Sequence, residues 1–83
     1  MRQYISESDL LDLLNAELAR EGGCDHCRFS GPLFRRDEPD ANGCNWKTHA
    51  VILTCSGRTP GGCRSAAYRV LDVFGRRYNL TEA

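Results

Sequence analysis

The spacing of the cysteines constrains this chain more than any other feature of its sequence. Two residues separate Cys24 from Cys27, and a turn of that length allows two thiolates to reach one metal ion. Cys55 and Cys63, later in the chain, can complete a shell of four ligands. The sequence therefore predicts a zinc site formed by Cys24, Cys27, Cys55 and Cys63.

The second half of this site departs from a typical zinc motif, which leaves alternatives open. Seven residues separate Cys55 from Cys63, whereas zinc ribbons and fingers use a second short ligand pair. His26, His49 or Cys44 can each replace one ligand, and Cys44 is the cysteine that we expect to lie outside the site. Free cysteines are often small buried hydrophobic residues, so a metal-free chain with packed cysteines is a further alternative.

The length of the chain gives a bound metal a physical role. We expect 83 residues to form one domain, spanning residues 1–83, in the size range where a single hydrophobic core provides little stability. No apolar run is long enough to cross a bilayer, so we expect no membrane association and a cytoplasmic location. Disulfides are rare in that compartment, which leaves metal ligation, redox chemistry or burial to explain five cysteines.

The start of the chain predicts an amphipathic helix. Ser6 is a favourable N-cap with Asp9 three residues later, and Gly22-Gly23 marks the end of the pattern. Between them, five leucines fall on an arc of about 160° at helical spacing. That arc is wide enough to leave Leu11 or Leu13 at its edge, where it can contact a second copy of the chain. The leucines are Leu10, Leu11, Leu13, Leu14 and Leu18.

Two extended segments follow the first cysteine pair. Residues 28–36 contain Gly31-Pro32, so we expect a strand with a kink or a bulge, because proline cannot donate to a sheet ladder. Residues 37–43 form a turn by composition, and Asn42-Gly43 at its end is a strong hairpin signal. Residues 44–55 are then the second strand of the hairpin.

A second amphipathic helix is predicted from about Cys63, with Gly75 as its end and residues 76–80 as a short third strand. The resulting order is helix, strand, strand, helix, with a short strand at the C-terminus. This order indicates a small two-layer α+β domain in which both helices cover one face of an antiparallel sheet. The apolar face of the second helix contains Cys63, Ala66, Ala67, Val70, Leu71, Val73 and Phe74.

Charge is balanced over the chain but unevenly distributed. The 11 basic and 11 acidic residues leave a negative surplus in residues 1–27 and a positive surplus in residues 55–83. Pairing between the two helices explains this better than an anionic partner, because nucleic-acid binders usually carry a strong basic excess. Asp72 is also spaced to form ion pairs with Arg69 or Arg76 along the helix. We therefore favour a protein partner over a nucleic acid.

A thiol-dependent redox protein is the main competing function. Cys24 and Cys27 have the spacing of thioredoxin-like motifs, but such motifs stabilise the first thiolate at a helix N-terminus, whereas this pair follows a helix. Cys63 begins a helix and is the other candidate reactive thiol. We expect no enzymatic activity. The sequence predicts a zinc-stabilised domain that acts as a binding or adaptor module for a macromolecular partner.

Overall fold

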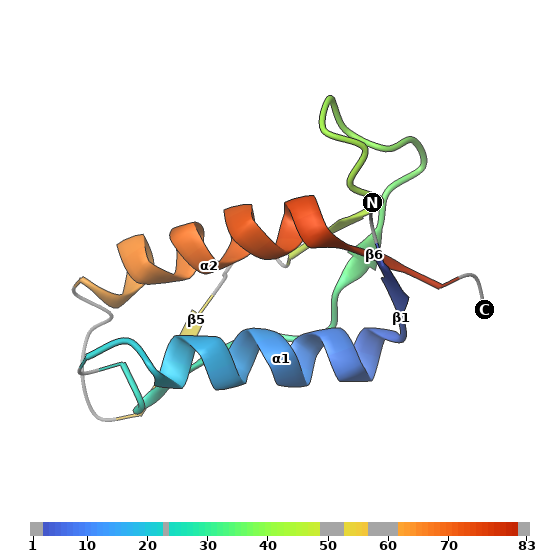
Figure 1. Cartoon of the computed structure of the whole chain (residues 1–83). Helices are drawn as coiled ribbons and strands as arrows, with labels where there is room; N and C mark the ends of the chain where they lie inside the picture. Colours follow the sequence, from blue (N-terminus) through green and yellow to red (C-terminus); the bar gives the residue numbers. More distant parts are fainter. Residues whose placement is uncertain (1–2, 23, 49–52, 57–61, 82–83) are drawn as a thin grey trace.

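The computed structural model describes residues 3–22, 24–48, 53–56 and 62–81. These residues form a small α+β arrangement of two helices and short paired strands, in agreement with the predicted fold class (Figure 1). The elements follow in the order β1 (Gln3–Ile5), α1 (Glu7–Ala19), β2 (Cys27–Phe29), β3 (Phe34–Arg35), β4 (Trp46–Lys47), β5 (Leu53–Cys55), α2 (Cys63–Arg77) and β6 (Tyr78–Leu80).

Helix α1 begins as the sequence predicts and ends slightly earlier. The Ser6 side chain accepts a hydrogen bond from the Asp9 amide at 3.2 Å, which satisfies one of the free amides of the first turn. The helix closes on Arg20 before the two glycines are reached. Leu10, Leu14 and Leu18 are fully buried, so the leucine-rich face forms part of the core.

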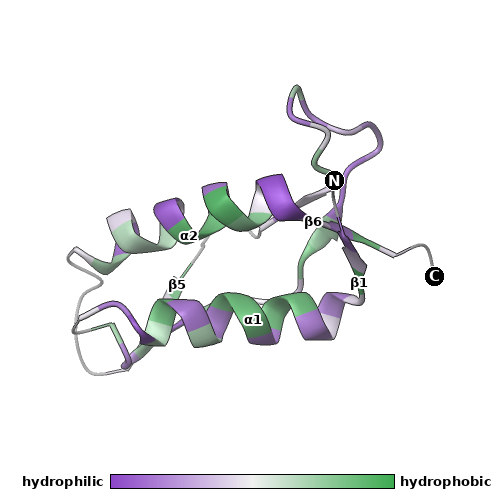
Figure 2. Ribbon diagram, in the orientation of Figure 1, coloured by the Kyte–Doolittle hydropathy of each residue, from purple (hydrophilic) through white to green (hydrophobic). Residues whose placement is uncertain are grey.

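Helix α2 is longer than predicted and runs directly into β6. Gly75 lies inside it and does not end it, because the helix continues to Arg77 and Tyr78 caps it in an extended conformation. The two helices run side by side and antiparallel, with hydrophobic and hydrophilic residues alternating along both (Figures 1 and 2). An ion pair of 3.8 Å joins Arg69 of α2 to Glu21, which lies two residues after the end of α1.

The predicted hairpin is present as two separate antiparallel ladders. β2 pairs with β5, with Cys27 opposite Cys55, and β3 pairs with β4, with Phe34 opposite Lys47. The strand predicted over residues 28–36 is interrupted between Phe29 and Phe34, the segment that contains Gly31-Pro32, where a kink or a bulge was expected. Residues 49–52 of the predicted second strand lie outside the described residues.

A third ladder joins the two ends of the chain and was only half predicted. The expected C-terminal strand forms as β6, but it pairs in parallel with β1, which the sequence did not indicate, and not with the hairpin. The described part of the fold therefore contains two antiparallel ladders and one parallel ladder, where a single antiparallel sheet was expected.

Hydrogen bonds hold the β3–β4 region against β6, and another holds β2 against α1. The indole Nε1 of Trp46 donates to the Tyr78 carbonyl at 2.9 Å, and Asn79 is buried and donates to the Gly43 carbonyl at 3.0 Å. On the other side, Asn15 of α1 accepts a hydrogen bond from the Phe29 amide of β2 at 2.7 Å. Neither of the two helices that the structure describes is long and apolar enough to cross a membrane.

Candidate metal centre

Cys27 and Cys55 face each other across the β2–β5 ladder. Their Cα atoms lie 4.0 Å apart, and the Ser56 amide beside them donates to the His26 carbonyl at 3.0 Å. Hydrogen-bonded and non-hydrogen-bonded pairs alternate along an antiparallel ladder, so the bond between Ser56 and His26 makes Cys27 and Cys55 a non-hydrogen-bonded pair. Side chains come closest in pairs of this kind. The structure places the two sulfur atoms in disulfide geometry.

Cys24 lies next to Cys63, the first residue of α2, and these two sulfur atoms are also in disulfide geometry. Their Cα atoms are 5.6 Å apart. The turn that carries Cys24 is held by its own backbone: the Cys24 amide donates to the Glu21 carbonyl and the Cys27 amide to the Cys24 carbonyl, both at 3.1 Å. The end of α1 thereby positions two cysteines within one tight turn.

His26 adds a nitrogen atom to this region. Its Nε2 is buried and has no hydrogen-bond partner among the described residues. The ligand atoms of His26, Cys27 and Cys55 all lie within 4.8 Å of one another, so this group could hold a metal ion. A buried polar atom without a partner costs free energy, and coordination to a metal would satisfy it.

The four predicted ligands thus come together in two pairs, and His26, one of the three alternatives, joins one of them. Cys24 and Cys63 do not belong to the group of three within 4.8 Å that the described residues form. Cys44 lies apart from both pairs as a buried free thiol that donates to the Trp46 carbonyl at 3.4 Å. His49 lies outside the described residues. Whether the set of four cysteines binds metal together remains a prediction.

The cysteines connect three distant parts of the chain whichever chemistry they use. One pair joins the turn after α1 to the start of α2, and the other joins β2 to β5, with sequence separations of 39 and 28 residues. A disulfide and a metal–thiolate bond use the same sulfur electrons, so they are alternative states of one cluster. Disulfides would stabilise the fold by restraining the unfolded chain, and a metal ion would stabilise it by binding only the folded chain.

No protein-family model matches the chain, and no curated protein or solved structure is significantly similar to it. The role of the site therefore follows from its own residues. The sequence already offered His26 as a replacement ligand, and this residue lies between the two cysteines of the short motif. The pairing of the cysteines could not be anticipated, because four cysteines allow three pairings and spacing does not distinguish them.

Proposed function

We propose that the chain is a non-enzymatic binding module whose fold is held by a zinc ion at the cysteine cluster. The observation that carries the proposal is the unpartnered, buried Nε2 of His26 beside the sulfur atoms of Cys27 and Cys55. Zinc binds cysteine sulfur and histidine nitrogen and takes four ligands in structural sites. Our ligand set remains Cys24, Cys27, Cys55 and Cys63, with His26 as the replacement that the geometry favours for Cys24 or Cys63.

The proposal applies to the reduced chain, because only thiolates ligate zinc. It therefore implies a reducing compartment, and we propose the cytoplasm. The second candidate has the same binding role but no metal, with the two cysteine pairs as disulfides. The disulfide geometry of both pairs favours that candidate, and it would place the chain in an oxidising compartment.

Burial of the cysteines favours a structural site over a catalytic one. Cys24 and Cys27 are each 3% exposed and Cys63 is 6% exposed, so substrate has little access to the sulfur atoms. Structural zinc sites are closed in this way, whereas catalytic sites keep one position open. The Cys24-Cys27 motif also follows the C-terminus of α1, and each of its cysteines pairs with a partner elsewhere. Both points weigh against a redox enzyme that uses Cys24 and Cys27 as a dithiol.

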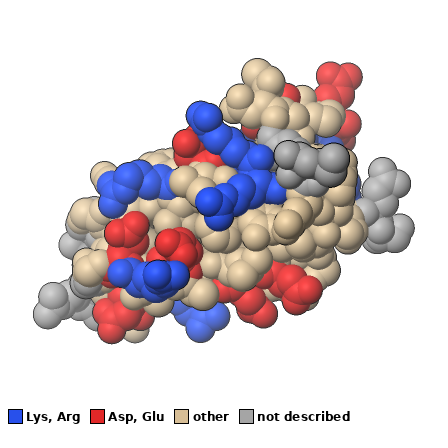
Figure 3. All heavy atoms as spheres, in the orientation of Figure 1, with Lys and Arg blue, Asp and Glu red and all other residues tan. Residues whose placement is uncertain are grey.

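The distribution of charge favours a protein partner. In Figure 3, Lys and Arg lie mainly over α2, while Asp and Glu lie mainly over α1. Arg69 pairs with Glu21, and Arg76 pairs with Asp72 at 3.4 Å, so part of the basic surface is neutralised by the chain itself. Binding to nucleic acid depends on cations that can contact phosphates, so this neutralisation favours a protein partner over a nucleic acid.

The proposal is tested by purifying the chain under reducing conditions and measuring its zinc content by elemental analysis and native mass spectrometry. We expect one zinc ion per chain, and loss of the circular dichroism of the helices when a chelator removes it. The control variant is Cys44→Ser, which changes a cysteine outside both pairs and should retain the metal. A folded chain without metal that contains two disulfides would overturn the zinc proposal and establish the second candidate.

A further inference from the structure

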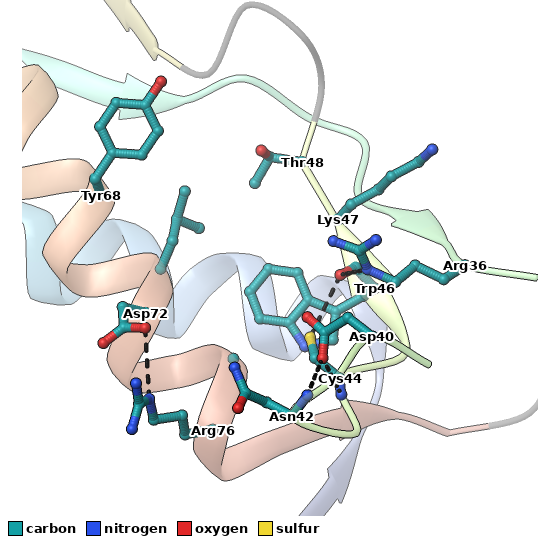
Figure 4. Close-up of a pocket in the computed structure, with 12 residues that line it drawn as sticks. Arg36, Asp40, Asn42, Cys44, Trp46, Lys47, Thr48, Tyr68, Asp72 and Arg76 are labelled. Atoms are coloured by element: carbon teal, nitrogen blue, oxygen red, sulfur yellow. Dashed lines mark hydrogen bonds and ion pairs between the residues drawn. The ribbon is translucent and has the colours of Figure 1, made fainter. Parts of the chain in front are cut away.

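A pocket of about 300 Å³ lies between the segment 36–48 and the outer face of α2 (Figure 4). The pocket is lined by residues from the middle and the end of α2, whereas the Cys24–Cys63 pair lies at the start of that helix. Its apolar wall consists of Trp46, Leu71 and Cys44. Its volume is at the lower end for ligand sites and is sufficient for one large side chain.

The main apolar wall of the pocket is fixed before anything binds. The Trp46 side chain is held by the hydrogen bond from Nε1 to the Tyr78 carbonyl, and the residue is only 3% exposed. Tyr68 stands at the open side of the pocket and is 58% exposed. Tryptophan, tyrosine and arginine are the residue types that dominate binding energy at protein interfaces, and a rigid wall lowers the entropy lost on binding.

The charged groups of the pocket favour an acidic occupant. Arg36, Lys47 and Arg76 face only two carboxylates, Asp40 and Asp72. Both carboxylates are already engaged: Asp72 pairs with Arg76, and Asp40 accepts hydrogen bonds from the backbone of its own loop. Figure 4 shows Arg36 and Lys47 together at one edge of the pocket, beside Trp46. The backbone of Lys47 belongs to the β3–β4 ladder, but its ammonium group forms no hydrogen bond or ion pair with any described residue and the residue is exposed, so this group is available to a ligand.

We propose that this pocket binds an acidic segment of a protein partner. One aliphatic or aromatic side chain of the segment would lie against Trp46 and Leu71, and a neighbouring carboxylate would pair with Lys47 and the terminal nitrogens of Arg36. The inference rests on the binding role proposed above and specifies its partner. It does not depend on the chemistry of the cysteines.

The test uses the fluorescence of Trp46, which is the only tryptophan of the chain. The full chain is titrated with an acetylated and amidated peptide, Glu-Glu-Leu-Glu-Glu, up to millimolar concentration. Parallel titrations use the same peptide with glycine in place of leucine, the same peptide with lysine in place of glutamate, and a short single-stranded oligonucleotide. Circular dichroism and metal content are measured on each sample first, so that loss of the fold or of zinc is recognised separately.

We expect the leucine peptide to change the Trp46 emission saturably, and the glycine and lysine peptides to bind more weakly. Lys47→Gln should weaken binding about 5-fold, as removal of one exposed charge pair does, and added salt should weaken it further. The matched control is Arg28→Gln, an exposed cation on β2 that does not line the pocket and should leave the affinity unchanged.

Absence of a response in the folded chain overturns the pocket proposal, and so does equal affinity for the lysine peptide or an unchanged affinity in Lys47→Gln. Preferential binding of the oligonucleotide overturns the choice of a protein partner. A folded chain that contains zinc but fails these titrations would support the zinc proposal and contradict the pocket proposal. A metal-free chain that binds the peptide would contradict the zinc proposal and support the pocket proposal.

Discussion

The side chain of Asn45 pairs with the backbone of Leu80 as a neighbouring strand would. Its Nδ2 donates to the Leu80 carbonyl at 3.1 Å, and its Oδ1 accepts from the Leu80 amide at 2.8 Å. Asn79 returns the contact, because its Oδ1 accepts from the Asn45 amide at 3.2 Å. These bonds attach the loop before β4 to β6 and satisfy backbone groups that would otherwise be buried without partners.

We predict that Asn45→Ala destabilises the fold by about 1–3 kcal/mol, because it leaves buried donors and acceptors of β6 without their partner. Urea denaturation followed by circular dichroism measures the change. Gln3→Ala is the matched control, since it removes an exposed amide from β1 and should alter stability by less than about 0.5 kcal/mol. Equal effects of the two variants would show that the Asn45 bonds contribute nothing specific.

The Asn45 contacts also show where sequence patterns stop being informative. Both helices were predicted because the helical spacing of apolar residues is a local signal, as is the Ser6 cap of α1. Side-chain bonds to a backbone 35 residues away leave no periodic trace, and β1 has only three residues, without the alternation that marks a half-buried strand. The turn at Asn42-Gly43 was predictable because Asn-Gly is a local hairpin signal, and in the structure Gly43 has a φ of 84°, which glycine adopts readily.

Coupling between Cys24 and Cys63 follows from their pairing. In the oxidised chain, Cys63→Ala should cost about 3–4 kcal/mol, the value expected for opening a loop of this length. Addition of Cys24→Ala should cost little more, because the pair is already lost, so the two effects are strongly non-additive. Urea denaturation of both single variants and the double variant measures this. Additive costs would mean that these residues act independently, and Cys44→Ala with Cys63→Ala provides the additive reference.

His26→Ala separates a metal ligand from a structural histidine. If His26 replaces Cys24 or Cys63 as a ligand, its loss should lower the zinc affinity by at least about 10-fold, whereas a site of four cysteines should keep its affinity. The stability of the metal-free chain should stay the same or rise slightly, since the variant removes a buried nitrogen that has no partner. Competition with a coloured chelator measures the affinity, and His49→Ala tests the other histidine considered as a ligand. Unchanged affinity in His26→Ala would exclude it from the site.

Gly75→Ala is predicted to stabilise the fold, because glycine inside a helix costs about 0.5–1 kcal/mol relative to alanine. The added methyl group would lie 3.7 Å from the Cys44 sulfur, an ordinary contact. A rise in melting temperature of about 4–8 °C per kcal/mol is expected for a domain of this size. Gly31→Ala is the contrasting variant: its methyl group would lie 3.1 Å from the Leu11 side chain, so it should not stabilise. A lower melting temperature for Gly75→Ala would show that the space beside the Cys44 sulfur does not accommodate the methyl group.

Two adjacent leucines of α1 should respond very differently to truncation. Leu14 is fully buried in the hydrophobic core, whereas Leu13 is 40% exposed. Leu14→Ala should cost about 2–5 kcal/mol, which can unfold a domain of this size, while Leu13→Ala should cost less than about 1 kcal/mol. Thermal denaturation measures both. Sedimentation of the Leu13→Ala variant tests the self-association that the sequence suggested for this helix. If the chain dimerises through the exposed leucine, the variant should dissociate at a higher protein concentration than the unmodified chain. A Leu13→Ala dimer that sediments identically would place the contact elsewhere.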